Sequence, residues 1–235
     1  MKNVIIIPTY NERENIKILV PIIFNIIPDI SILVVDDNSP DGTSTVVKEM
    51  QTHYTRLSLL SRSNKNGLGP AYINAFKEVI KDPEVKSVIM MDADLSHDPK
   101  SLNEMIQKSD KFSVIIGSRY IQGGNTIGWE YWRRALSFWG NLYCRMITRM
   151  PIHDCTGGFN VISAKLLRKI DFSKMDMGGY AFIMQLKYFL YKEGGTFFEV
   201  PITFVNRTGG ESKISSHIIN EGILAPWEMI MRRYK

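Results

Sequence analysis

Short apolar segments recur along the first hundred residues, and this recurrence constrains the fold more than any other feature. Four such segments are present, at 4–7, 30–35, 57–60 and 87–91. Their apolar runs are typical of strands that are buried on both faces of a parallel sheet, although the third is weaker. Helical patterns and short connections fill the intervals. This alternation predicts an α/β fold with a parallel sheet covered by helices.

Acidic side chains follow three of the four predicted strands. Glu12 follows the first strand, Asp36 and Asp37 follow the second, and Asp92 and Asp94 follow the fourth. In open α/β sheets, ligands bind outside the carboxyl ends of the strands. Acids are also common in turns, which explains any one of these positions more easily than all three. The pattern favours a ligand site at this edge.

Asp92 and Asp94 are the pair best suited to a metal ion. Carboxylates at positions i and i+2 of a strand point the same way. Such oxygens suit Mg²⁺ or Mn²⁺, which complete their shells with substrate phosphates. By itself the pair is equally compatible with a polar turn that caps the next helix. No glycine-rich dinucleotide or phosphate loop follows the first strand, so a phosphate ligand needs the metal and basic side chains.

The second half of the chain supplies basic side chains. Between residues 119 and 149 the only acid is Glu130, whereas the arginines are Arg119, Arg133, Arg134, Arg145 and Arg149. Arg133, Ser137 and Asn141 recur every four residues, which places them on one face of a helix. The side chains on that face are hydrogen-bond donors suited to binding phosphate oxygens; the alternative is a polar face exposed to solvent.

An aromatic stripe runs through the same region at alternating steps of three and four. It consists of Trp129, Trp132, Leu136, Trp139, Tyr143, Met146 and Met150. The spacing predicts one long amphipathic helix. Most such stripes are core, and burial is the favoured interpretation. A membrane-interface face is the alternative, because Trp and Tyr with flanking Arg gather there.

Residues 207–235 form the last segment. Arg207 and Lys213 flank two glycines, a pattern that favours a lid over phosphates and is also compatible with a polar turn. The apolar stretch that follows has a basic end, so it either lies on an anionic membrane surface or packs as a terminal helix. We expect one catalytic domain over 1–206, with the lid and the amphipathic helix of 207–235 belonging to the same domain.

Charge and cysteine content limit the class of partner. The formal net charge of +5 favours anionic partners. Nucleic acid is not expected, because acids gather at the predicted ligand edge and would repel its backbone. Cys144 and Cys155 have no metal-ligand spacing, which indicates free thiols in a reducing compartment. No signal-peptide pattern precedes the first strand, and no apolar span of ~20 residues is present, so we expect a cytoplasmic protein.

Six motifs together resemble the dolichol-phosphate mannose synthases of inverting glycosyltransferase family 2. They occur in order over nearly the whole chain, at 8–12, 36–43, 67–69, 92–97, 117–120 and 210–213. The resemblance implies a single-domain, Rossmann-like GT-A fold with a mostly parallel sheet. It also implies transfer of mannose from GDP-mannose to a polyprenyl or dolichyl phosphate, with Mg²⁺ or Mn²⁺ as cofactor.

The resemblance assigns a role to each site residue. The nucleotide-binding residues would be Pro8, Tyr10, Glu12, Asp37, Asp92, Arg207 and Lys213. The metal would be held by Asp92, Asp94 and Ser96. The acceptor phosphate would be bound by Arg119, Arg133 and Ser137. The catalytic residues would be Asp94, Arg119 and Arg133.

The chemistry of a phosphate acceptor supports these roles independently. The second pKa of a phosphate monoester is near ~6, so its oxygen is largely anionic at neutral pH and needs no general base. It does need screening from an anionic donor, which a divalent ion and arginines provide. We therefore expect a single in-line displacement with inversion and no protein nucleophile.

Departures from the family pattern leave alternatives open. Ser96 stands where archaeal relatives carry a glutamine metal ligand, and Ile183 and Gln185 replace polar residues of a sugar-side motif. The alternatives are a transferase for UDP-glucose or another nucleotide sugar, and a catalytically silent nucleotide-sugar binding module. Many relatives carry C-terminal membrane spans, and no such span is present in this sequence. We therefore expect this chain to contact the cytoplasmic face of a membrane in another way, either directly through amphipathic segments or through a small membrane-protein partner.

Overall fold

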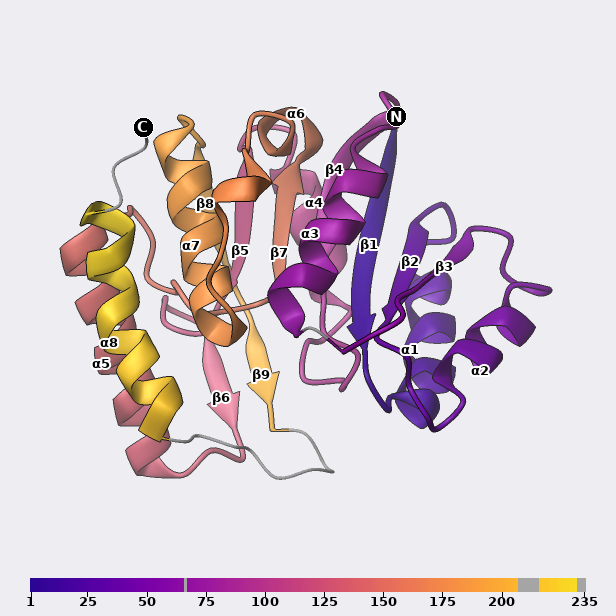
Figure 1. Ribbon diagram of the computed structural model, residues 1–235, viewed down its shortest axis with the longest axis horizontal. Helices are drawn as coiled ribbons and strands as arrows, with labels where there is room; N and C mark the ends of the chain where they lie inside the picture. The colour runs from indigo at the N-terminus through magenta and orange to yellow at the C-terminus, as the bar shows by residue number, and fades with distance from the viewer. Residues whose placement is uncertain (66, 207–215, 232–235) are drawn as a thin grey trace.

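A seven-stranded sheet forms the centre of the molecule, in the order β3-β2-β1-β4-β7-β5-β8 (Figure 1). The computed structural model describes residues 1–65, 67–206 and 216–231. The strands of this sheet are β1 (Lys2–Thr9), β2 (Ser31–Asp36), β3 (Leu57–Ser61), β4 (Val85–Met90), β5 (Val114–Ser118), β7 (Asn160–Ser163) and β8 (Phe197–Pro201). A separate parallel pair consists of β6 (Asn125–Ile127) and β9 (Thr203–Val205).

Helices cover both faces of the sheet, as the sequence predicts. They are α1 (Arg13–Ile26), α2 (Thr43–Met50), α3 (Leu68–Val79), α4 (Ser101–Lys108), α5 (Tyr131–Thr148), α6 (Ala164–Leu167), α7 (Gly179–Lys192) and α8 (Ser216–Met231). A short 3₁₀ helix, η1, spans Phe172–Lys174. Each of the four strands expected in the first half is present, so that part of the prediction is confirmed.

Alternate residues of β1 explain why its sequence is apolar throughout. Val4 and Ile6 belong to the core that includes α3 and α7, whereas Ile5 and Ile7 belong to the core that includes α1 and α4. Because the sheet separates two cores, both faces of its central strands exclude water. Burial of each such side chain contributes roughly 1.5–3 kcal/mol relative to exposure.

Strand β7 is the antiparallel member of a sheet that is otherwise parallel. It lies between β4 and β5, with Asn160 opposite both Met90 and Ile116. Because β7 runs backwards, the loop that precedes it, 150–159, meets the carboxyl ends of β4 and β5 at one edge. The prediction of a mostly parallel sheet is therefore confirmed, and the reversal of β7 brings a further loop to the predicted ligand edge.

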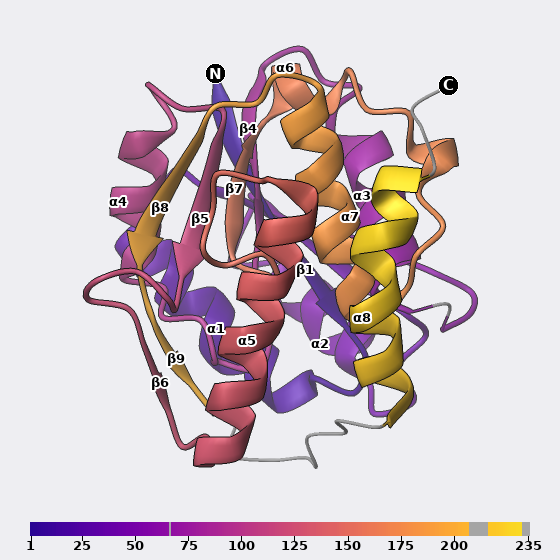
Figure 2. The same ribbon diagram turned by 90° about the vertical axis from the view of Figure 1, so that its left-hand side faces the viewer.

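The aromatic stripe of α5 is exposed, so the prediction that it is core is wrong for most of its length. Trp132 is 58% exposed, Trp139 63% and Met146 70%, whereas Asn141 and Cys144 are buried. Helices α5 and α8 lie side by side at the end of the molecule away from β3 (Figure 2). The inward side of α5 carries Asn141, whose side chain accepts the backbone N–H of Cys155 in the loop before β7, and Cys144, which belongs to the apolar core. No helix in the described part of the chain is long and apolar enough to cross a bilayer.

Candidate functional site

Asp36 anchors the loop that follows β2. Its carboxylate is 1% exposed and accepts hydrogen bonds from Thr9 Oγ1 at 3.0 Å, Ser39 Oγ at 2.5 Å and Ser44 Oγ at 2.6 Å. The first contact follows from register, because Thr9 lies opposite Asp36 on the neighbouring strand. Buried carboxylates need such donors. Asp36 therefore fixes the conformation of this loop.

Asp37 forms a buried ion pair with Arg62. The Arg62 Nη1 atom lies 2.5 Å from Asp37 Oδ1, and both side chains are less than 10% exposed. Arg62 comes directly after β3, at the same sheet edge as the acids. The sequence analysis missed it, although its position at the carboxyl end of a strand was a usable signal.

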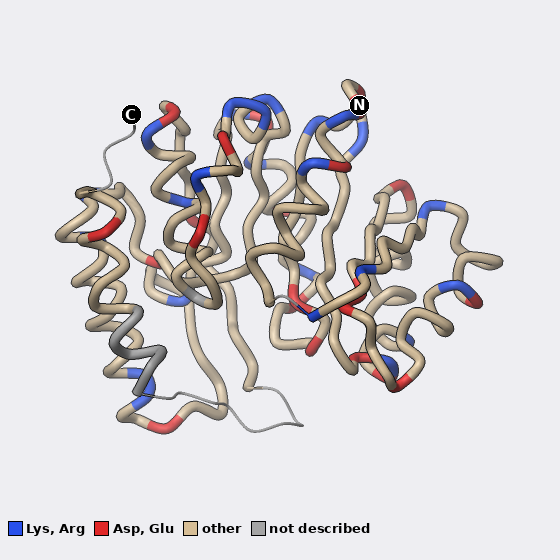
Figure 3. Tube along the Cα trace, in the orientation of Figure 1, with Lys and Arg blue, Asp and Glu red and all other residues tan. Residues whose placement is uncertain are grey.

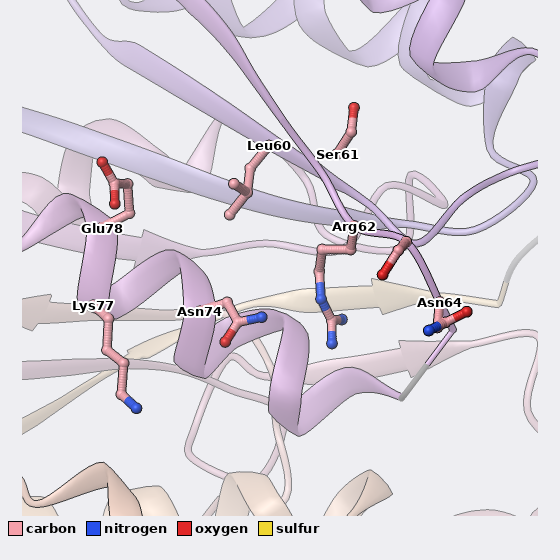
Figure 4. Close-up of a pocket in the computed structure, with 8 residues that line it drawn as sticks. Leu60, Ser61, Arg62, Asn64, Asn74, Lys77 and Glu78 are labelled. Atoms are coloured by element: carbon pink, nitrogen blue, oxygen red, sulfur yellow. The ribbon is translucent and has the colours of Figure 1, made fainter.

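A polar pocket of about 450 Å³ lies beside this arginine, between β3 and α3 (Figure 4). Its lining residues are Leu60, Ser61, Arg62, Ser63, Asn64, Asn74, Lys77 and Glu78. None of the predicted site residues is among them. Arg62 links this pocket to the predicted nucleotide site through its ion pair with Asp37.

The turn after β1 carries two of the other predicted nucleotide-binding residues. Tyr10 is 38% exposed, and the Lys65 ammonium lies 3.6 Å from the centre of its ring. The Glu12 carboxylate accepts a hydrogen bond from Asn15 Nδ2 at 2.6 Å. Pro8 precedes this turn and pairs with β2. The structure thus brings Pro8, Tyr10, Glu12 and Asp37 to one edge of the sheet, and their nucleotide-binding role stays a prediction.

Asp94 is oriented by Ser96. The Ser96 hydroxyl and backbone N–H both donate to Asp94 Oδ1, at 2.5 and 3.1 Å, and Ser96 is 1% exposed. Leu95 between them has φ of 62°, which folds this turn tightly. Ser96 therefore acts on Asp94 in this structure. A direct bond from Ser96 to a metal ion stays a prediction.

The donor set at the end of β4 fits a hard cation. The Asp92 side chain is 37% exposed, and a Cβ added to Gly158 would lie 3.7 Å from both of its carboxylate oxygens. No group of three His, Cys, Asp or Glu residues in the described ranges is arranged to hold a metal. An ion at Asp92 and Asp94 would therefore need further oxygen ligands, as Mg²⁺ and Mn²⁺ obtain from phosphates.

His97 is a buried, uncharged side chain that contacts Asp92. It is 2% exposed, stacks on Phe159 at 4.9 Å and meets the edge of Phe204 at 5.6 Å. Its Nδ1 accepts the Asp92 backbone N–H at 3.1 Å. Burial lowers the pKa of His97 despite the nearby Asp92 and Asp94 carboxylates, so the ring is neutral at physiological pH. His97 thus separates the acids from the arginine described next without adding charge.

Arg119 is held by a buried carboxylate that the sequence analysis did not single out. Its Nε and Nη2 donate to the two carboxylate oxygens of Asp154, each at 2.8 Å, and Nη2 also donates to Thr156 Oγ1 at 2.8 Å. Burial raises the pKa of Asp154, but Arg119 and Lys187 outweigh it and hold that pKa well below its usual range. Asp154 is therefore ionised and fixes the Arg119 guanidinium rigidly.

The predicted file of donors on α5 divides into two parts. Arg133 lies with its guanidinium 4.1 Å from the Trp129 ring centre, and Ser137 Oγ accepts the Tyr120 hydroxyl at 2.5 Å. Asn141 is 2% exposed, and its Oδ1 accepts the backbone N–H of Cys155 at 2.7 Å. Asn141 thus holds the loop before β7, whereas the acceptor-binding role of Arg133 and Ser137 stays a prediction. Arg207 and Lys213 lie outside the described residues.

Acidic and basic segments converge below β1 and β4 in the view of Figure 3, at the carboxyl edge of the sheet. The Arg119 guanidinium lies 5.6 Å from the Phe204 ring, which contacts His97, which in turn contacts Asp92. The acids after β4 and the arginine after β5 are therefore connected by a chain of two aromatic side chains, His97 and Phe204. Such an edge can hold two anionic groups next to each other.

A mixed sheet with this acidic edge defines a class, the glycosyltransferases of GT-A fold. The model for glycosyl transferase family 2 matches residues 4–171. The chain belongs to glycosyl transferase family 2.

Two relatives are similar over almost their whole length. A polyprenol monophosphomannose synthase from Mycolicibacterium smegmatis is 38% identical over 230 residues, which cover 96% of this chain and 86% of that protein. An undecaprenyl-phosphate mannosyltransferase from Micrococcus luteus is 34% identical, with 99% of each chain covered.

Solved structures agree with the fold. A mannosyltransferase from Pyrobaculum calidifontis, in complex with GDP-Man and Mn²⁺, superposes with a TM-score of 0.67 at 16% identity and covers 100% of this chain. This chain covers 65% of that one. Glucosyl-3-phosphoglycerate synthase from Mycobacterium tuberculosis gives a TM-score of 0.69 at 13% identity, with 99% of this chain and 79% of that chain covered. The GT-A prediction is therefore confirmed.

Proposed function

We propose that this protein transfers mannose from GDP-mannose to a polyprenyl or dolichyl phosphate, with inversion, using Mg²⁺ or Mn²⁺. The observation that carries the proposal is the near-full-length similarity to a polyprenol monophosphomannose synthase and an undecaprenyl-phosphate mannosyltransferase. The complex of a structural neighbour with GDP-Man and Mn²⁺ supports the choice of donor and of metal. The acids and arginines at one sheet edge give this chemistry a physical basis.

Each side of the edge would take one anionic group. Asp92 and Asp94 would hold the ion on the donor diphosphate, where a divalent cation stabilises the charge of the leaving group. Arg119 and Arg133 would bind the acceptor phosphate with charge-assisted hydrogen bonds. Because that phosphate is already anionic, none of the site residues needs to remove a proton. The neutral His97 is consistent with this division, since it adds no charge between the two anions.

Product formation tests the proposal directly. The purified chain is incubated with undecaprenyl phosphate, MnCl₂ and either GDP-mannose or UDP-glucose, and the lipid products are measured by mass spectrometry. We expect a mannosyl lipid phosphate from GDP-mannose, at least about tenfold faster than any glucosyl product, and none in the presence of a chelator. Product from UDP-glucose alone would contradict the mannose assignment. GDP binding without turnover on any donor would indicate the silent binding module instead.

We also propose that α5 and α8 rest on a membrane surface, on its cytoplasmic face. The exposed apolar residues that support this proposal are Trp132, Leu136, Phe138, Trp139, Met146, Ile223, Leu224 and Trp227. In the tube view of Figure 3, few charged residues lie along the described parts of α5 and α8, and Arg133 and Arg134 lie near the start of α5. Aromatic side chains with flanking arginines suit the interface of an anionic bilayer. The free, buried cysteines fit a reducing compartment.

Replacement of Trp132 and Trp139 by serine is expected to weaken binding to vesicles that contain an anionic phospholipid. Removal of two exposed indoles from an interface lowers the partition coefficient about tenfold or more. Flotation with such vesicles measures the effect. The matched control is Ile18→Ser on α1, which changes an apolar side chain that is 50% exposed elsewhere. Equal flotation of both variants and the wild type would contradict this surface assignment.

A further inference from the structure

Lys187 is a charged side chain in a fully buried position. It lies in α7, is 1% exposed, and has Leu186 and Leu190 of the apolar core beside it. Lysine is almost never fully buried unless its charge is compensated. The compensation must therefore come from specific hydrogen-bond partners of the Lys187 ammonium.

Those partners are both ends of the turn that holds Arg119. Lys187 Nζ donates to the backbone oxygens of Asp154 and Gly157, each at 2.9 Å. Within the turn, the Gly157 N–H donates to Asp154 Oδ1 at 2.8 Å. A Cβ on Gly157 would lie 3.1 Å from the carboxyl atoms of Asp154, so a side chain there would require the carboxylate to shift by a few tenths of an ångström. Lys187 thus fastens the turn whose carboxylate binds Arg119.

The charge of Lys187 matters as well as its hydrogen bonds. The Glu199 side chain is 10% exposed, and its Oε1 accepts the Asp154 backbone N–H at 3.0 Å. Glu199 Oε2 also lies 2.7 Å from His153 Nδ1, and the carboxylates of Asp154 and Glu199 both interact electrostatically with Lys187. Removal of the Lys187 cation would leave more negative charge at the turn that holds Arg119, and the approach of an anion would become less favourable. An apolar side chain of similar size would fill the volume of Lys187 but would leave this imbalance.

We propose that Lys187 is a positioning residue of the acceptor-phosphate site. It fixes the 154–157 turn so that Asp154 presents Arg119, and it balances the second carboxylate so that the site accepts an anion. This inference rests on the proposed function, because it assumes that Arg119 binds the acceptor phosphate.

The test is the variant Lys187→Met in the full chain. We expect the KM for undecaprenyl phosphate to rise about tenfold or more, because a displaced Arg119 would lose about one charge-assisted contact with the phosphate. The kcat and the Kd for GDP with Mn²⁺ are expected to stay within about twofold, since the donor side is not touched. In an Arg119→Lys background the same change should add little, because residues that act through one another are not additive.

Arg168→Met is the matched control. Arg168 also donates to two backbone oxygens, those of Ile80 and Asp82, but at the other edge of the sheet. It should leave the KM for the acceptor unchanged. If Lys187→Met does not fold, Lys187→Gln carries the same test, because it keeps N–H donors and removes the charge.

Three outcomes would overturn the inference: an unchanged KM for the acceptor, an equal loss of GDP affinity, or failure of both Lys187 variants to fold. The last two would assign Lys187 to the fold as a whole. A wild-type chain that forms no lipid product from any donor would instead contradict the proposed function itself.

Discussion

Asparagine in place of Asp94 is expected to lower mannosyl transfer by about a thousandfold or more. The reason is that Asp94 is proposed to hold the divalent ion on the leaving diphosphate, and loss of one anionic ligand weakens stabilisation of charge in the transition state. A thousandfold change corresponds to about 4 kcal/mol in the activation free energy. The fold should survive, because the amide can still accept the hydrogen bonds that Ser96 gives to Asp94 Oδ1. The measurement is initial rate at saturating GDP-mannose and Mn²⁺.

Asp98→Asn provides the control from the same loop. Asp98 also has a short carboxylate side chain, and its Oδ1 accepts the backbone N–H of Lys100 at 3.0 Å. Asp98 lies outside the predicted metal site, so the mannosyl-transfer rate of Asp98→Asn should remain within about twofold of the wild-type rate. An Asp94→Asn variant that keeps more than a tenth of the wild-type rate would contradict the metal role.

The sequence predicted the fold well where a local pattern decides the structure. Apolar runs such as 4–7 and 30–35 became buried strands because both faces of a central strand need apolar side chains. The position of β7 was not predictable in the same way. Its direction is set by pairing with β4 and β5, which are distant in sequence, and no local pattern records such pairing.

The stripe on α5 shows a second limit of local patterns. Helical spacing correctly predicted one long helix, but amphipathicity alone does not say whether the apolar face meets protein or something else. In this fold α5 turns polar side chains inward, because Ser137 contacts Tyr120, next to Arg119, and Asn141 contacts Cys155 in the loop before β7. The apolar side was therefore left outward, where Trp139 is 63% exposed.

Some residues of the candidate site were predictable from local sequence and others were not. The acids and Arg119 were predictable because they end strands, and the carboxyl edge of a parallel sheet collects strand ends. Asp154 and Lys187 were missed, because their roles come from contacts with each other and with Arg119 across large sequence separations. Arg62 is intermediate, since its position after β3 was a signal that the sequence analysis did not use.

Alanine in place of Arg133 is expected to raise the KM for polyprenyl phosphate by about thirtyfold, because a charge-assisted contact to phosphate contributes roughly 1.5–3 kcal/mol. Binding of GDP, measured by calorimetry in the presence of Mn²⁺, should stay within about twofold. Stability should change little, since Arg133 is half-buried and its hydrogen bond to Asn206 Oδ1 is long, at 3.5 Å. Its 4.1 Å contact with the Trp129 ring orients the guanidinium without neutralising it.

Two further variants separate charge from geometry at this position. Arg133→Lys keeps the charge but loses the planar fork and the stacking on Trp129, so it should recover only part of the acceptor affinity. Arg134→Ala removes the neighbouring, exposed arginine, whose donor lies 3.4 Å from Asn125 Oδ1, and should leave the KM nearly unchanged. If Arg133→Ala weakened GDP binding and acceptor use equally, Arg133 would belong to the donor side. The proposed division of the edge into a metal–diphosphate half and an arginine–phosphate half would then be wrong.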